Sequence, residues 1–321
     1  MNNSVKRIGE GKNRLTEIDA IKGVSILFIV MIHSLCEHPV DLRGNLPLLS
    51  RMSSSFALCM FFVVSGFLYH HDETPMKEFF KKKVSRLLYP FLFFGTADIL
   101  LRFAFSSITY NPQNGDLIYG AWRIVSGQVY WFLYSMFLIL LVNRCCYKIR
   151  WWIAGACLVA LLCGLPEIPE FTLSESMYYN VWFCLGFWIS KRYGVMKEFA
   201  LKHYWLLLAI AMCGYVGTLM VHEKLITSWV LQLFGCGLIW LLCLKIADNK
   251  VLLHLGKYSM QYYTIHLLIC FVFYYIGAWV YGHTESYLIA FISVYSSMLF
   301  TTFIGFLIEK KIKLMYPVWG L

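Results

Sequence analysis

Charged residues are scarce in this chain of 321 residues: only 14% are Asp, Glu, Lys or Arg, whereas 59% are hydrophobic and 18% are aromatic. A soluble domain of ordinary composition carries about a quarter charged residues. The composition therefore excludes a disordered chain, a collagen-like fibre and an ordinary cytosolic enzyme. The mean hydropathy of +0.62 favours an integral membrane protein.

The sequence also lacks the motifs that mark a metal centre or a disulfide framework. Its eleven cysteines are an odd number without a Cys-x-x-Cys pair, and most lie in or beside apolar runs. We therefore interpret them as small buried hydrophobic residues. The nine histidines form no His-Glu-x-x-His motif and no paired Cys/His spacing, so neither a metal site nor a bound cofactor is predicted.

A cleavable signal peptide, a long linker and an internal repeat are missing as well. Glu10, Glu17 and Asp19 interrupt a basic leader, and no small-x-small cleavage site follows the first apolar run. The lack of a repeat gives no support to an inverted-repeat transporter. We expect a single membrane domain over residues 1–321.

Long apolar runs fill most of the chain. Because a membrane-spanning helix needs about 20 predominantly apolar residues, these runs predict an all-α membrane protein, a bundle of about ten transmembrane helices. The expected spans are 18–37, 55–70, 87–107, 128–147, 151–166, 176–190, 203–221, 228–247, 260–280 and 286–308.

The distribution of basic residues predicts the orientation of this bundle. With the N-terminus in the cytoplasm, the loops on that side hold 23 of the 28 Lys and Arg residues, as the positive-inside rule requires. An even number of spans then places both termini in the cytoplasm. We expect a multi-pass protein of the cell (inner or plasma) membrane, whose net charge of +10 needs no nucleic acid partner.

Three ionisable residues stand out in the first span. Lys22 and His33 are eleven residues apart, or three helical turns, so they share one helix face at a separation of about 16 Å. Asp19 precedes Lys22 by three residues and is expected to pair with it. A neutral imidazole facing a cavity can act as a general base or a transient nucleophile. The alternative is that Lys22 snorkels and His33 only packs against its neighbours.

Two further groups lie in or next to the second and third spans. Ser65-Gly66 allows two helices to approach closely, and the hydroxyl can point into a cavity; simple helix packing is the alternative. Lys83 and Arg86 share a helix face just before Pro90, where we expect a break or kink. Such a cationic pair suits a phosphate-bearing ligand, although an ordinary positive-inside anchor would look the same.

The last groups lie in the third and ninth spans. Ser259, Tyr263 and His266 follow the i, i+4, i+7 spacing and therefore align on one stripe of a helix. Asp98 and Arg102 are four residues apart, so we expect them to neutralise each other in a structural role.

In their order along the chain, these groups resemble the motifs of the acyltransferase-3 family of integral membrane acyltransferases. The family's opening motif is an acidic residue followed by Arg/Lys-x10-His with a Gly after the basic residue, and Asp19, Lys22, Gly23 and His33 match it. Four more segments are similar to later family motifs, namely Phe61-Phe62-Val-Val-Ser-Gly-Phe, Lys83-Val-Ser-Arg86, Tyr130-Trp131-Phe132-Leu133 and Leu255-Gly-Lys-Tyr-Ser-Met-Gln-Tyr-Tyr-Thr-Ile-His266. Lys83 stands where the family has Arg; it can bind phosphate but lacks the bidentate fork.

The resemblance implies an O-acyltransferase that moves an acyl group, commonly acetyl from acetyl-CoA as co-substrate, to a hydroxyl of a cell-surface sugar, polysaccharide or lipid-linked glycan. It implies that His33 and Asp19 are catalytic and that Lys22, Lys83 and Arg86 bind the acyl-CoA. His33 would act as general base or carry the acyl group itself.

The acceptor and the oxyanion need further polar or aromatic residues, for which the motifs suggest Ser65, Trp131, Tyr134, Ser259, Tyr263 and His266. The expected partners are acetyl-CoA, a glycan or sugar acceptor and the lipid bilayer. Two other functions stay open at this point: a transporter of a solute or lipid-linked glycan without acyl chemistry, and a membrane receptor or assembly subunit. An amino-group acceptor and a succinyl donor are also open.

Overall fold

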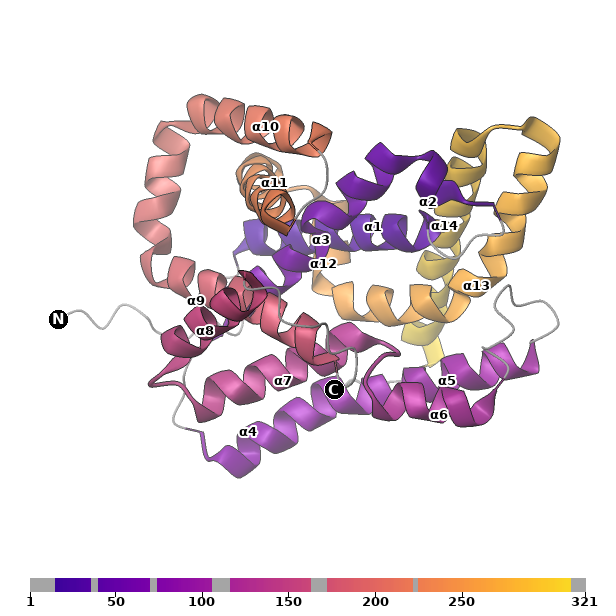
Figure 1. The fold of residues 1–321 in the computed structure, drawn as a ribbon, viewed down its shortest axis with the longest axis horizontal. Coiled ribbons are helices and arrows are strands. Elements are labelled where there is room, and N and C mark those ends of the chain that lie inside the picture. The colour runs from indigo at the N-terminus through magenta and orange to yellow at the C-terminus, as the bar shows by residue number, and fades with distance from the viewer. Residues whose placement is uncertain are drawn as a thin grey trace.

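The structure is a computed structural model that describes residues 15–35, 40–69, 74–105, 116–162, 172–221 and 225–312. Within these ranges the chain forms helices joined by short turns, without a β-strand (Figure 1). A helix satisfies its backbone hydrogen bonds within one segment, which is what a long apolar run in a bilayer requires. The prediction of an all-α fold is confirmed.

Each of the ten predicted spans coincides with one helix. These helices are α1 (Thr16–Leu35), α3 (Pro47–Phe67), α5 (Tyr89–Ala104), α7 (Trp131–Cys145), α8 (Arg150–Leu162), α9 (Leu173–Lys202), α10 (Tyr204–Met220), α11 (Leu225–Ile246), α13 (Ser259–Thr284) and α14 (Tyr287–Ile312). Over the described part of the chain, five helical segments are long and apolar enough to cross a membrane. A sixth is added if α9 and α10, which meet at a bend of 91°, form one broken span. The count of ten spans and the cytoplasmic termini stay predictions.

Within the described ranges, four short helices lie outside the ten predicted spans: α2 (Leu42–Asn45), α4 (Met76–Lys83), α6 (Leu117–Val125) and α12 (Lys250–Lys257). The start of α12 has a clear cause in the sequence. The side chain of Asn249 accepts hydrogen bonds from the backbone N–H groups of Val251 and Leu252 at 3.0 and 3.1 Å. Such a cap satisfies amide groups that have no partner inside the helix.

The break expected near Pro90 takes the form of a π-helical turn. Pro90 has no backbone N–H, so it cannot bond to the carbonyl group four residues earlier. The segment η1 (Val84–Leu88) widens the helix just before it, and the N–H of Tyr89 bonds to the carbonyl of Val84. A wider turn of this kind accommodates a disturbed hydrogen-bond ladder, and it joins α4 to α5 without a loop.

The first long helix, α1, lies in the interior of the bundle. It packs against α3, α11, α12, α13 and α14, and Figure 1 shows it at the centre, with α13 and α14 to one side and α9 and α10 to the other. Ala20, Ile21 and Ile26 on this helix are almost completely buried. The central position of α1 carries Lys22 and His33 into the middle of the molecule.

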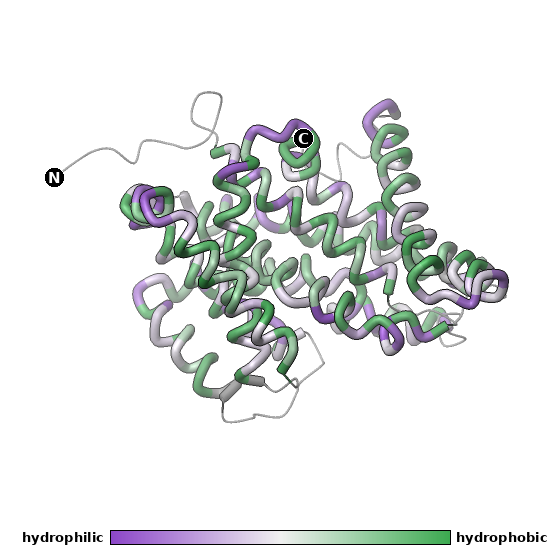
Figure 2. The backbone as a smooth tube through the Cα atoms, turned by 90° about the horizontal axis from the view of Figure 1, so that it is seen from above, coloured by the Kyte–Doolittle hydropathy of each residue, from purple (hydrophilic) through white to green (hydrophobic). Residues whose placement is uncertain are grey.

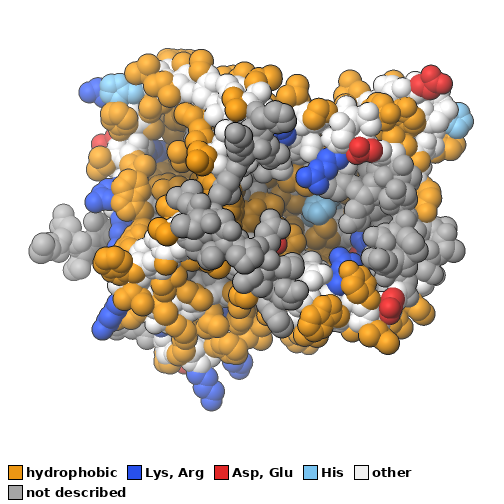
Figure 3. Space-filling view, viewed as in Figure 1, with side chains coloured by type: hydrophobic (Ala, Val, Ile, Leu, Met, Phe, Trp, Pro, Cys, Tyr) orange, Lys and Arg blue, Asp and Glu red, His pale blue; other side chains and the backbone are white. Residues whose placement is uncertain are grey.

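Apolar side chains cover much of the exterior. Trp205 of α10 and Phe300 of α14 are exposed over 78% and 67% of their area, and the tube in Figure 2 is green along most helices and purple mainly near turns. On the face shown in Figure 3, basic side chains lie mostly along the left and lower edges, around broad hydrophobic areas. An outer surface of this kind fits a lipid environment better than water.

Candidate active site

A cavity of about 170 Å³ lies between α1, α3, α7 and α13. Four residues singled out in the sequence line it, although they come from three different helices: Lys22, Ser65, Ser259 and Tyr263. The rest of its wall is apolar and consists of Ile29, Phe61, Val64, Leu68, Leu87, Phe132, Met136 and Met260. Phe61, Val64, Phe132 and Met260 belong to the quoted motifs, but the sequence assigned none of the eight to a cavity, because in an apolar run a cavity wall and a packed core look alike.

Lys22 enters this cavity as half of an ion pair. Its Nζ lies 2.7 Å from Oδ1 of Asp19, and the two side chains are only 20% and 7% exposed. The predicted pairing is confirmed. An ammonium group has three N–H donors, so the ion pair orients Lys22 and still leaves it able to donate to a bound ligand.

Glycine residues bring α12 against α1 at the level of this ion pair. A Cβ atom added to Gly256 would lie 1.8 Å from the carbonyl oxygen of Asp19, and one added to Gly23 would lie 2.3 Å from that of Leu252. Only glycine fits at such distances. The glycine that follows Lys22 in the first motif therefore serves helix packing, and the contact sets α1 against the start of α13, which follows α12 directly.

A second pair of glycines brings α3 against α9. An added Cβ would lie 1.9 Å from the carbonyl oxygen of Phe183 at Gly66, and 1.9 Å from that of Val63 at Gly186. The close helix approach predicted for Ser65-Gly66 is confirmed. With Gly66 turned toward α9, Ser65 is left to line the cavity.

Two histidines from distant parts of the chain meet beside this cavity. The ring centroids of His33 on α1 and His266 on α13 are 5.1 Å apart, and the ring of Tyr263 lies 5.7 Å from that of His266. Tyr263 lines the cavity, as does Ile29, one helical turn before His33. The sequence predicted two intramembrane histidines, but it contained no signal that they touch.

The hydrogen bonding of His266 defines its tautomer. The imidazole is completely buried, and its Nδ1 lies 3.0 Å from the carbonyl oxygen of Tyr262. A carbonyl oxygen only accepts, so Nδ1 carries the hydrogen and Nε2 of the neutral ring holds a lone pair. Among the described residues Nε2 has no hydrogen-bond partner. A buried acceptor in this state can receive a proton or a hydrogen bond from the site.

A family model described as an acyltransferase domain, that of the acyltransferase-3 family, matches residues 15–310. The chain belongs to the acyltransferase-3 family. The match includes every helix that lines the cavity, and together with the apolar helices it identifies a multi-pass membrane acyltransferase. No curated protein and no solved structure matches the chain.

Two of the residues expected to bind acyl-CoA lie outside the cavity of this acyltransferase. The ammonium group of Lys83 lies 5.5 Å from the ring centroid of Phe79, and Arg86 is exposed on η1. The prediction relied on regular α-helical geometry, in which residues i and i+3 share a face. The π-helical turn after Lys83 breaks that geometry. Leu87, next to Arg86, does line the cavity, whereas neither cation is among its lining residues.

Trp131 and Tyr134 also lie outside the cavity, on either side of Phe132, which lines it. Trp131 stacks on Tyr179 with ring centroids 5.6 Å apart. Tyr134 covers Gly127, whose φ of +75° suits glycine, and a Cβ there would lie 2.6 Å from the Tyr134 ring. Of the acceptor or oxyanion candidates, Ser65, Ser259 and Tyr263 therefore meet in the cavity, and His266 lies beside it.

Two other acidic residues, Asp98 and Glu17, also have basic partners. Nε of Arg102 lies 3.0 Å from both carboxylate oxygens of Asp98, which confirms their predicted neutralisation. Glu17, at the start of α1, accepts hydrogen bonds from the hydroxyl of Tyr193 and from Nζ of Lys197, both at 2.5 Å. No spacing along the chain indicates this second contact, because Tyr193 and Lys197 lie more than 170 positions after Glu17.

His254 lies on α12, which packs against α1 and is not one of the predicted spans. Partial burial lowers the pKa of His254 on α12 below its ordinary value, and the ammonium groups of Lys310 and Lys257 lower it further. Both effects favour the neutral form of the imidazole.

Proposed function

We propose that this acyltransferase transfers an acetyl group from acetyl-CoA to a hydroxyl group of a sugar, polysaccharide or lipid-linked glycan at the cell membrane. The observation that supports this most is the 170 Å³ cavity in which Lys22, Ser65 and Tyr263 meet beside the His33–His266 pair. Pockets that enclose a whole drug-sized ligand measure about 300–1,000 Å³. A smaller cavity suits the acyl end of a donor, and a short acyl group best.

In the proposed reaction, His33 acts as general base. It takes the proton from the acceptor hydroxyl while the hydroxyl oxygen attacks the thioester carbonyl carbon. The C–S bond then breaks, and the thiolate of CoA leaves and takes up the proton. The products are an O-acetyl ester and free CoA. If the imidazole carried the acyl group instead, CoA would be released before the acceptor reacts.

The neighbours of His33 support this role. Nε2 of His266 can accept a hydrogen bond from the His33 ring and so orient it, because its own Nδ1 is bonded to the carbonyl of Tyr262. The hydroxyl groups of Ser65 and Tyr263 would donate to the oxyanion that develops on the thioester carbonyl. In this scheme Asp19 acts through Lys22, which it holds in place.

The donor would enter from the side on which Lys22, Lys83 and Arg86 lie. The nucleotide is too large for the cavity, so its phosphates would remain outside it, at Lys83 and Arg86. Lys22 would meet the donor at the mouth of the cavity. Cationic side chains form strong charge-assisted hydrogen bonds with phosphate oxygens.

Purified protein in proteoliposomes tests the proposal when it receives acetyl-CoA with and without a glycan acceptor. We expect free CoA to form only when acceptor is present, together with acetylated acceptor. Free CoA formed without acceptor in an amount equal to that of the protein would indicate the acyl-imidazole route. Glycan flux across the vesicle membrane without any CoA would contradict acyl transfer and favour a transporter.

Surface glycans of cells with and without the gene provide the matching test in cells. Mass spectra should differ by acetyl groups on one sugar, while the glycan itself remains on the surface. Identical spectra, or loss of the whole glycan from the surface, would contradict the proposal.

A further inference from the structure

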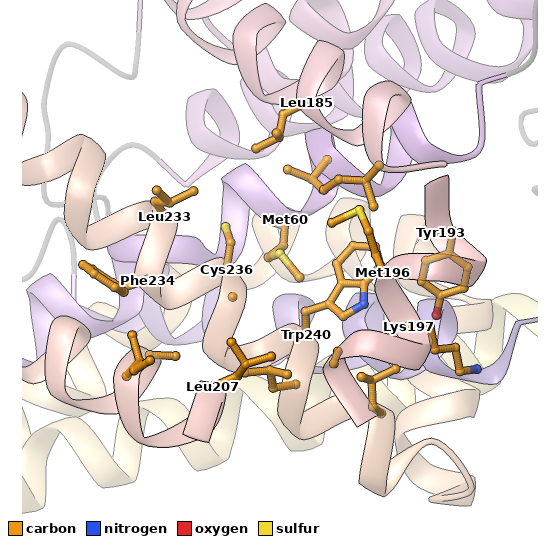
Figure 4. A pocket seen from close by; sticks show the side chains of 18 of the residues that line it. Met60, Leu185, Tyr193, Met196, Lys197, Leu207, Leu233, Phe234, Cys236 and Trp240 are labelled. Carbon is orange, nitrogen blue, oxygen red and sulfur yellow. The ribbon is translucent and has the colours of Figure 1, made fainter. Parts of the chain in front are cut away.

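A second cavity, of about 420 Å³, lies between α3, α9, α10 and α11 (Figure 4). Its wall is almost wholly apolar, with Met60 and Val63 from α3 and a long stretch of α11 from Leu233 to Leu244. None of the residues in the proposed catalytic scheme lines it. Its volume falls in the range of ligand-binding pockets.

This cavity shares no lining residue with the active-site cavity. The two lie against different faces of α3, since Met60 and Val63 line one of them and Val64 and Ser65 line the other. Between them, the backbones of α3 and α9 touch at Gly66 and Gly186, where even a Cβ atom would not fit. A ligand in the larger cavity therefore cannot reach the acyl donor through this seam.

The dimensions of the larger cavity match one leaflet of a bilayer. Leu233 and Leu244 are eleven residues apart on α11, which corresponds to about 16 Å of helix. The hydrocarbon core of a bilayer is about 30 Å thick, or about 15 Å for each leaflet. An extended hydrocarbon chain anchored at one membrane surface would span the same length.

The hydroxyl and ammonium groups of Tyr193 and Lys197 lie at one end of this cavity. Figure 4 shows Tyr193 and Lys197 together at that end, with Leu233 and Phe234 at the other. Lys197 is 37% exposed, and its ammonium donates one hydrogen bond to Glu17. Two of its three N–H donors remain for a ligand.

The surrounding charge is positive at the same end. From position 191 to 202, α9 carries Lys191, Arg192, Lys197 and Lys202 against a single acidic residue, Glu198. On α11, Lys245 follows the lining residue Leu244 and lies 4.9 Å from the ring centroid of Tyr204. Basic residues at a membrane surface attract anionic lipid headgroups.

We propose that the cavity binds one hydrocarbon chain of an anionic glycerophospholipid, with the lipid phosphate at Lys197 and the chain extending toward Leu233 and Phe234. The proposal gives the lipid no part in acyl transfer, since the two cavities share no lining residue. Its phosphate contacts the residue that holds Glu17, two positions before Asp19.

Native mass spectrometry of the full-length protein, after exchange from phosphatidylglycerol into detergent, tests the chain site. The variant Gly237→Phe places a ring in the cavity, and Gly217→Phe is its matched control. An added Cβ meets no atom within 4 Å at either position, but only Gly237 lines the cavity. We expect Gly237→Phe to retain about tenfold less phosphatidylglycerol than Gly217→Phe or the wild type.

The headgroup contact is tested separately by Lys197→Gln. This variant should lose the preference for phosphatidylglycerol over phosphatidylcholine and still retain one lipid. Glu17→Gln removes the same ion pair but keeps the ammonium group, so it should keep the preference.

Equal retention by Gly237→Phe and Gly217→Phe, or a wild type that retains no phosphatidylglycerol, would overturn the chain site. Equal loss of the preference in Lys197→Gln and Glu17→Gln would overturn the headgroup contact. Neither measurement involves an acyl donor, so both hold whether or not acetyl transfer is demonstrated.

Discussion

Replacing Gly256 by alanine tests the helix contact that sets α1 against α13. The new Cβ would lie 1.8 Å from the carbonyl oxygen of Asp19, whereas ordinary contacts begin at about 3.4 Å. Helices α1 and α12 would therefore have to separate by about 1.6 Å. Because α13 follows α12 directly, the shift also moves Ser259 and Tyr263 relative to Lys22.

The size of the effect follows from this displacement. A misplacement of about 1 Å at a catalytic site can lower the rate about 10²-fold. Overpacking costs about 1–3 kcal/mol, and the better helix propensity of alanine offsets about 0.5–1 kcal/mol of it. We expect Gly256→Ala to lose about 10²-fold in kcat and to melt at a lower temperature than the wild type.

Acyl-transfer rates and thermal melting of the detergent-solubilised protein provide the readouts. The matched control is Gly155→Ala in α8, where an added Cβ meets no atom within 4 Å; its melting temperature and rate should equal those of the wild type or rise slightly. If Gly256→Ala behaved like Gly155→Ala in both assays, the reasoning about this contact would be refuted.

Three further changes address the ion pairs and the cavity wall. Arg102→Leu removes the cation beside the buried Asp98 carboxylate, which should cost about 3–5 kcal/mol and lower the melting temperature. A double variant with Asp98→Leu should recover most of the loss, and failure to recover would argue against mutual neutralisation. Lys22→Gln should raise KM for acyl-CoA while Lys22→Arg largely preserves it, and an unchanged KM in Lys22→Gln would exclude Lys22 from donor binding. Ser65→Ala should lower kcat by about 10²–10³ with KM unchanged, whereas a change in KM alone would assign Ser65 to substrate binding.

The helices of this acyltransferase follow closely from its sequence. Apolar runs such as 18–37 and 260–280 end within a few residues of α1 and α13, because in a bilayer a long apolar segment has only the helix available to satisfy its backbone. Local pairs were equally predictable: Asp19 with Lys22 and Asp98 with Arg102 lie one helical turn apart, so spacing alone brings them together.

Contacts between distant helices were not predictable in the same way. Nothing in the spacing along the chain indicates that His33 meets His266 or that Glu17 meets Lys197, since helix packing decides both. The glycines are an intermediate case. The sequence predicts that Gly66 permits a close approach, but only the structure shows that its partner is the backbone of Phe183.

Sequence spacing was misleading where the backbone departs from a regular helix. Lys83 and Arg86 share a face only in an uninterrupted α-helix, and the π-helical turn before Pro90 removes that condition. Motif neighbours can also point in different directions. Phe132 lines the cavity while Trp131, one residue earlier, stacks on Tyr179.

The rate of acyl transfer by a purified, folded His33→Ala variant tests the central claim most directly. The control is His283→Ala, at the exposed end of α13, where the ring Nδ1 lies 2.8 Å from the carbonyl of Trp279, far along the helix from the cavity-lining Tyr263. Loss of a general base lowers rates by about 10²–10⁴-fold, and we expect a loss of this size for His33→Ala and none for His283→Ala. A folded His33→Ala protein that acylates its acceptor at the wild-type rate would contradict the proposed active site.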